Sequence, residues 1–412
     1  MRIFLPLRHH AMRRVWGGQL LSAIGDEMNT VATVWLAATV FRTGAGYLLA
    51  VHSACAVAAI FALGGFVESR DSRRTLIACD VLRALAVAVI PLAALLHLPL
   101  GGFLVCSVVV LGIAYPLFDS VLRRCLPRLT PEPQLLGATN ALLAMTTRFA
   151  RVSGPGLVAV FGALIPTVQL FTVDAASFAL SALAIASVAG SHFYQPEGTA
   201  AAARSGLRGT VALIRAQPLV RHCILSGGLV FAAWSLVFPL GIGLLLHERE
   251  PDNVSALGAA IMAYGAGNLA TNLLLGSVTI APQLLLFAGR MIGGAGFLLA
   301  ALAPQRGLML AGCLLAASGG PATDLGFLGI LQTCYPAKDF APVYRMQLAV
   351  SFAAKLVLFF GSPILFQRFG ISPVLSLAAG VILLVSAVGY VRYGRTPVAP
   401  STPPPADAPA PR

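Results

Sequence analysis

The sequence predicts an all-α membrane protein with about twelve transmembrane helices in two six-helix halves. Of the 412 residues, 58% are hydrophobic and only 10% are charged, whereas soluble domains carry roughly 25% charged residues. Apolar runs of about 20 residues, the length needed to cross a bilayer, recur along the whole chain. A short repeat also relates the two halves. Lipid is therefore the expected surrounding of most side chains.

Twelve apolar runs predict the membrane-spanning helices. They fall at roughly 15–41, 46–67, 75–96, 101–122, 135–164, 167–189, 219–246, 255–277, 281–303, 306–333, 341–366 and 371–393. Because the number of runs is even, we expect both termini on the same side of the membrane.

The basic residues predict the orientation of these helices. With a cytoplasmic N-terminus, about 19 of the 28 Lys and Arg residues fall in cytoplasmic segments and about four fall outside, as the positive-inside rule requires. The sequence thus predicts a multi-pass protein of the bacterial inner (cytoplasmic) membrane with both termini in the cytoplasm. The net charge of +13 is explained by these connections, and we expect no nucleic-acid partner.

Composition and an internal repeat divide the chain. We expect an N-terminal half at 1–189, a cytoplasmic linker at 190–217, a C-terminal half at 218–393 and a disordered Pro/Ala-rich tail at 394–412. LRRCLP at 122–127 echoes LQTCYP at 331–336, and a Gly/Pro element follows each about 30 residues later. Parallel repeats of six helices occur in transporters of the major facilitator type.

No enzyme or cofactor chemistry is predicted. The seven cysteines are dispersed without a CxxC pair, and no phosphate-binding loop, GxSxG, HExxH or metal-spaced histidine cluster occurs. We therefore expect no catalytic residues, no metal site and no cofactor.

Ionisable residues inside the predicted spans are the candidate functional groups, because each costs roughly 2.5–3.5 kcal/mol at a helix centre on insertion scales. They are Asp26, Glu27, Asp174, Asp324, Arg148, Arg151, Arg290 and Lys355. For Asp174 we favour a plain structural pairing within the N-terminal half.

The first helix carries a polar stripe. Its members recur at steps of three and four residues and so share one face: Gln19, Ser22, Asp26, Asn29, Thr30 and Thr33. Our hypothesis is that Asp26 or Glu27 is a proton-coupling or substrate-sensing carboxylate, since burial favours proton uptake by a carboxylate. The alternative is a structural polar contact between helices.

The fifth, tenth and eleventh spans supply further candidates. Arg151, with Gly154 and Pro155, indicates either a hinge with a cation in a cavity or a buried ion pair beside a helix break. Lys355 occupies nearly the repeat-equivalent position of Arg148, so two cations at matched depth would attract an anionic substrate. Asp324 follows Gly319-Gly320-Pro321, which suggests a bent gating helix or a packing kink with a paired acid.

Four segments resemble one branch of a known superfamily. They are RRVWGGQLLSAIGDEMNTVATVWL at 13–36, GGFVESRDSRRTLIACDVLRA at 64–84, ATNAL at 138–142 with ARVSGP at 150–155, and VDAASFALSAL at 173–183. Together they resemble the enterobactin-exporter-like branch of the major facilitator superfamily, over most of the first half and parts of the second. The resemblance implies a proton-driven exporter of small molecules, such as siderophores or hydrophobic antibiotics, that works by alternating access.

The 64–84 segment resembles the superfamily's signature connection between helices two and three. Its physical interpretation is a gating network at the helix ends, with Asp80 and Arg83 paired nearby; its members are Gly64, Glu68, Asp71, Arg73, Arg74, Asp80 and Arg83. The alternative is an ordinary positive-inside loop. The chain departs from the family pattern in having Glu68 in place of the usual Asp and Ser69 where a basic residue is expected. The equivalent connection in the second half, near 277–282, carries no charged residues.

Three functions remain open from the sequence. The first is a proton-coupled antiporter that exports a small amphipathic molecule, and the second is a dedicated siderophore exporter. The third is a membrane sensor or assembly protein that does not transport, which the polar stripe on the first helix argues against. We expect protons, a small-molecule substrate and the lipid bilayer as partners, and a monomer.

Overall fold

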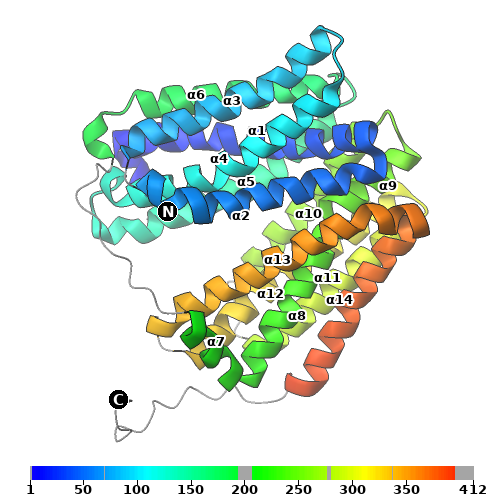
Figure 1. Ribbon diagram of the computed structural model, residues 1–412. Coiled ribbons are helices and arrows are strands. Elements are labelled where there is room, and N and C mark those ends of the chain that lie inside the picture. Colours follow the sequence, from blue (N-terminus) through cyan, green and yellow to red (C-terminus); the bar gives the residue numbers. More distant parts are fainter. Residues whose placement is uncertain (1, 69, 194–206, 276–279, 336, 395–412) are drawn as a thin grey trace, which may run out of the picture.

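The computed structural model describes residues 2–68, 70–193, 207–275, 280–335 and 337–394, and within these ranges all regular secondary structure is helical. Six long helices form the N-terminal half (Figure 1): α1 (His10–Phe41), α2 (Ala45–Glu68), α3 (Ser72–Leu95), α4 (Leu100–Leu129), α5 (Leu136–Phe161) and α6 (Thr167–Ala186). The short helices η1 (Arg2–Arg8), η2 (Arg42–Gly44), η3 (Pro133–Leu135) and η4 (Gly190–His192) precede or connect them.

The C-terminal half repeats this arrangement. Its first span consists of α8 (Pro218–Ser235), the π-helical turn η5 (Leu236–Gly241) and α9 (Ile242–Arg249). The others are α10 (Val254–Leu275), α11 (Pro282–Leu302), α12 (Arg306–Cys334), α13 (Ala337–Phe369) and α14 (Ile371–Tyr393). Figure 1 shows the two halves as separate bundles, N-terminal above and C-terminal below.

Each predicted apolar run coincides with one of these long helices, which confirms the predicted fold class. Some helices extend beyond the apolar runs into flanking segments that carry basic residues. For example, α1 begins earlier, at His10, and α4 ends later, at Leu129. In the described residues, nine helical stretches are long and apolar enough to cross a membrane, one of which joins α1 to α2. Two helices with polar residues, α5 and α10, fall outside that set.

The segment between the halves contains regular structure where the sequence predicted a linker. The helix α7 (Leu207–Ala216) lies within 190–217 and packs against the C-terminal half, because the Tyr335 hydroxyl donates to the Leu213 carbonyl oxygen at 3.0 Å. An amphipathic helix of ten residues was not distinguished from a linker by composition alone. Residues 194–206 and the predicted tail, apart from Gly394, lie outside the described residues.

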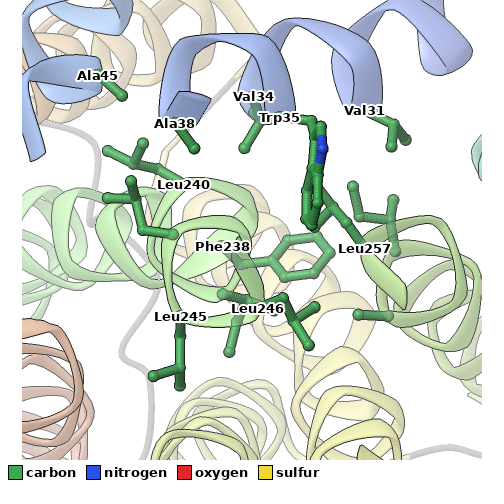
Figure 2. Packing of buried hydrophobic residues seen from close by; sticks show 14 of the residues in the cluster. Val31, Val34, Trp35, Ala38, Ala45, Phe238, Leu240, Leu245, Leu246 and Leu257 are labelled. Carbon is green, nitrogen blue, oxygen red and sulfur yellow. The ribbon is translucent and has the colours of Figure 1, made fainter. Parts of the chain in front are cut away.

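The two halves meet at one end of the molecule, where α1 and α5 finish. One buried cluster there contains residues of both halves, including Val34 and Trp35 of α1 and Phe238 of η5. Figure 2 shows α1 lying across η5, α9 and α10 at this contact. At the other end, separate clusters form within each half, around Met12 in the N-terminal half and Phe287 in the C-terminal half. The molecule is therefore closed between its halves at one end only.

Candidate functional site

A cavity lies between the two halves and has two adjoining lobes. The larger, about 330 Å³, is lined by Asp26, Glu27, Thr33, His52, Tyr115 and Lys355, among others; we call it the acidic lobe. The smaller, about 210 Å³, is lined by Arg148, Arg151, Trp234, Phe238, Tyr264 and Asn268, among others; we call it the basic lobe. Glu27, Thr30 and Trp234 line both. The cavity is thus built from spans that are far apart in the sequence.

The polar stripe of α1 divides between two environments. Gln19 donates to the Ser181 hydroxyl of α6 at 2.9 Å, and Asn29 donates to Asp174 of α6 at 2.5 Å. Asp26, Asn29, Thr30 and Thr33 line the cavity, so Asn29 belongs to both environments. The polar contact between helices is thus present at Gln19 and Asn29, and the proton-coupling role of Asp26 or Glu27 stays a prediction.

Asp174 is the buried end of a polar chain that begins at the cavity. Thr33 donates to the Asn29 side-chain oxygen at 2.7 Å, and the Asn29 amide donates to Asp174. The Ser177 hydroxyl also contacts Asp174, at 3.2 Å. Asp174 is fully buried, so its partners supply the hydrogen bonds that such a group requires. This agrees with the structural role predicted for it within the N-terminal half.

Glu27 and Arg151 form an ion pair across α1 and α5, with the Arg151 Nε 3.6 Å from a Glu27 carboxylate oxygen. Gly154 permits this approach of the helices, because a Cβ there would lie 2.7 Å from the Glu27 Cβ. The predicted helix break at Gly154 and Pro155 is absent, and α5 runs through both residues. Neighbouring helices pack against this segment, and such packing lets a transmembrane helix tolerate proline.

Arg148 lies one turn before Arg151 and lines the basic lobe. Among the described residues it makes no ion pair within 4.0 Å and no hydrogen bond. Lys355 lines the acidic lobe with its ammonium 5.2 Å from the centre of the Phe359 ring. The two cations predicted at matched depths thus both reach the cavity, but in different lobes.

Asp324 on α12 does not line either lobe. It is exposed and makes no ion pair within 4.0 Å in the described part of the chain, although Arg151, Arg148 and Arg290 attract it electrostatically. Arg290 is buried and donates to the Ser226 hydroxyl at 2.9 Å. Gly319 brings α12 against α11, since a Cβ there would lie 2.0 Å from the Gly289 carbonyl oxygen. Gly319 therefore serves close helix packing, and a gating role of the Gly-Gly-Pro segment stays a prediction.

Two residues of the predicted gating network, Asp71 and Arg73, make interactions outside that network. Asp71 caps α3 by accepting from the Arg74 backbone N–H at 3.0 Å, and the Arg73 side chain donates to the Ala186 carbonyl oxygen at the end of α6. No ion pair joins Asp71 to Arg73 or Arg74 in the described residues. Gly64 and Glu68 lie in α2, but their side-chain surroundings fall outside the described part.

Asp80 and Arg83 form the predicted pair, buried in the membrane span of α3. The Arg83 guanidinium also lies 4.3 Å from the ring centre of Phe118 and 4.4 Å from that of Phe178. It is therefore enclosed by α3, α4 and α6, where two aromatic faces and one carboxylate stabilise its charge. This pair lies inside the N-terminal half, away from the contact between the halves.

Sequence reasoning missed His52 and Asn268 as cavity residues. A single histidine or asparagine in an apolar span was the available signal for both, because such groups are costly in lipid. No group of three or more His, Cys, Asp or Glu side chains suited to a metal ion occurs in the described residues.

Comparisons with known proteins identify the family. The sequence matches the transmembrane secretion effector family over residues 2–337. The chain belongs to this family of major facilitator transporters. It is thus a multi-pass membrane transporter of a small-molecule substrate. A search of curated proteins finds no match to the sequence.

Three solved structures with the same fold are distant in sequence. A bacterial homologue of the iron transporter ferroportin, in an inward-facing state, has a TM-score of 0.70 at 14% identity and covers 94% of this chain and 99% of its own. The nucleoside transporter NupG has a TM-score of 0.68 at 13% identity, with 93% and 100% covered. A bacterial metal transporter has a TM-score of 0.67 at 14% identity, with 93% and 98% covered. At these identities the similarity establishes the fold alone.

Proposed function

We propose that this family member is a proton-coupled secondary transporter that exports a small amphipathic molecule by alternating access. The observation that carries the proposal is the cavity between the halves, which places two carboxylates beside an aromatic wall. Asp26 and Glu27 reach it from α1 and Trp234 from α8. A site shared between two halves changes its access when the halves rock against each other.

The orientation belongs to the same proposal. If the basic connections are cytoplasmic, as the positive-inside rule predicts, the closed end of the molecule faces outward and the cavity faces the cytoplasm. Exported molecules would enter in this state. A reporter enzyme fused to each terminus tests the orientation, and activity of either fusion on the outer side of the membrane contradicts it.

Transport in inverted inner-membrane vesicles tests the function. We expect uptake of at least one probe from a set of anionic, neutral and cationic nitrobenzene derivatives to require an inwardly acidic pH gradient. Vesicles without the protein and vesicles treated with an uncoupler are the controls. Uptake that the gradient does not change would rule out proton coupling, and the absence of any uptake would favour the non-transporting alternative. Nothing in the described residues favours the siderophore alternative over other substrates.

A cross-link at the closed end tests alternating access. Gly46 of α2 faces Ser362 of α13, and a Cβ at position 46 would lie 2.2 Å from the Ser362 hydroxyl oxygen, within reach of a disulfide. In a chain whose seven native cysteines are replaced, oxidised G46C/S362C should lose at least tenfold in transport rate and regain it on reduction. Oxidised protein with an unchanged rate would refute the mechanism, and the single variant G46C is the control.

A further inference from the structure

Two arginines on one face of α5 give the basic lobe an excess of positive charge. Arg148 and Arg151 are three residues apart and so lie side by side on the helix. One carboxylate, Glu27, lines this lobe, and it pairs with Arg151 alone at 3.6 Å. Asp324 attracts both arginines but stands outside the lobe lining. Among the described residues, one guanidinium therefore has no counter-ion in the lobe.

Two uncharged side chains of the basic lobe, those of Tyr264 and Asn268, add hydrogen-bond donors. Trp234 Nε1 donates to the Tyr264 hydroxyl at 2.8 Å, which leaves the Tyr264 O–H as a donor toward the lobe. The Asn268 side-chain oxygen accepts from Asn272 at 3.1 Å, so its amide N–H groups remain as donors. Thr30 donates its single O–H to the Asp26 carbonyl oxygen at 2.9 Å, so its hydroxyl oxygen is left as an acceptor. A ligand that supplies acceptors and negative charge complements this set.

Three aromatic rings line the same lobe, and we call them the aromatic wall: Trp234, Phe238 and Tyr264. The rings of Phe238 and Tyr264 are stacked with centroids 4.2 Å apart and an interplanar angle of 22°. The ring centroids of Trp234 and Tyr264 are 6.5 Å apart, and the hydrogen bond from Trp234 Nε1 to the Tyr264 hydroxyl holds the two rings together. Flat, rigid aromatic faces of this kind favour stacking with another ring. The lobe volume of about 210 Å³ is below the roughly 300–1,000 Å³ of drug-sized pockets, so it suits a single ring.

From these observations we infer that the basic lobe binds an aromatic anion, with its acidic group at Arg148 and Arg151 and its ring against Trp234, Phe238 and Tyr264. The inference rests on the proposed transport function and names its substrate class. The ligand competes with Glu27 for Arg151, because a carboxylate or sulfonate takes the same N–H donors. Export of one anion and entry of one proton both make the cytoplasm more positive, by two charges in total. A membrane potential that is negative inside therefore assists export.

Binding to the purified protein tests the substrate class without any ion gradient. The sequence contains three tryptophans, Trp16, Trp35 and Trp234, so the variant W16F/W35F keeps only the one that lines the cavity. Its fluorescence is titrated with 4-nitrobenzenesulfonate, 4-nitrobenzenesulfonamide and 4-nitrobenzyltrimethylammonium, which share a quenching ring and differ in charge. The sulfonate should bind at least tenfold more tightly than either of the others.

Two substitutions should change sulfonate affinity in opposite directions. R148Q should weaken binding about tenfold, whereas E27Q should strengthen it several-fold because Arg151 loses its internal partner. The control is R123Q, which removes an exposed arginine that pairs with Asp119 on α4 and should leave affinity unchanged. General damage to the fold would lower affinity in R148Q and E27Q alike, and equilibrium dialysis with the three-tryptophan chain repeats the comparison.

The inference is overturned if the ammonium probe binds more tightly than the sulfonate, or if R148Q binds the sulfonate as the R123Q control does. Failure of the proposed function is a separate result. In that case the sulfonate would still bind selectively to the purified protein, but no probe would move in response to a pH gradient in vesicles.

Discussion

Replacing Asp26 with Asn should abolish proton-driven transport, with a loss of at least 100-fold in the initial rate. Asp26 lines the acidic lobe and makes no ion pair within 4.0 Å in the described part of the chain. Glu27, one residue later, is already engaged by Arg151. Of the two acids, Asp26 is therefore the one free to take up and release a proton during the cycle, and an amide at this position cannot do so.

The matched measurement separates coupling from binding. Exchange of labelled for unlabelled probe across the membrane, without any gradient, needs the cavity and the conformational change but no net proton movement. D26N should retain this exchange within about threefold, and E27Q should retain part of the proton-driven rate. Full proton-driven transport in D26N would indicate that Glu27, rather than Asp26, is the proton-coupling carboxylate. Full transport in both D26N and E27Q would contradict a proton-coupling role for either acid.

Replacing Asp80 with Ala should destabilise the protein more than any other single change considered. Arg83 would then remain buried without its carboxylate, and breaking a buried ion pair in this way costs about 3–5 kcal/mol. The side chains of Asp80 and Arg83 are 0% and 2% exposed, so water does not replace the lost partner. We expect a much lower yield of monodisperse protein in detergent and a lower melting temperature.

A second variant distinguishes this structural role from the gating role that the sequence suggested. D80A/R83M removes both charges and fills part of the arginine's volume between Phe118 and Phe178, so it should recover stability relative to D80A. If the pair only holds α3, α4 and α6 together, the double variant should transport normally per folded molecule. Stable protein with abolished transport would instead restore the gating interpretation.

The membrane-spanning helices were predictable from hydropathy, and the reason is physical. Lipid offers no hydrogen-bond partners, so each apolar run must satisfy its own backbone groups as a helix. The bounds were less predictable, because α4 continues to Leu129 past its apolar run. The amphipathic helix α7 packs against the C-terminal half through a hydrogen bond to the Leu213 carbonyl oxygen. Such tertiary contacts cannot be predicted from amino-acid composition.

The candidate site was predictable only as a set of residue types. Asp26, Glu27, Arg151 and Lys355 attracted attention because charges inside a membrane span are costly, and all four reach the cavity. The same rule also selected Asp324, yet this residue does not line either lobe. The free-energy cost of a charge in a membrane span shows that the charge needs an ionic partner or water. It does not show which of these surrounds a given side chain.

The sequence by itself determined that this chain is a helical transporter with two related halves and a polar face on its first helix. The tertiary structure decided what that face contacts, since Gln19 bonds to Ser181 on α6, Asp26 lines the cavity, and Asn29 does both by bonding to Asp174 and lining the cavity. Helical periodicity fixes which side chains share a face, but neighbours that are 145 and 162 residues away in the sequence decide what Asn29 and Gln19 contact. The proposed proton coupling and substrate binding both depend on these tertiary contacts.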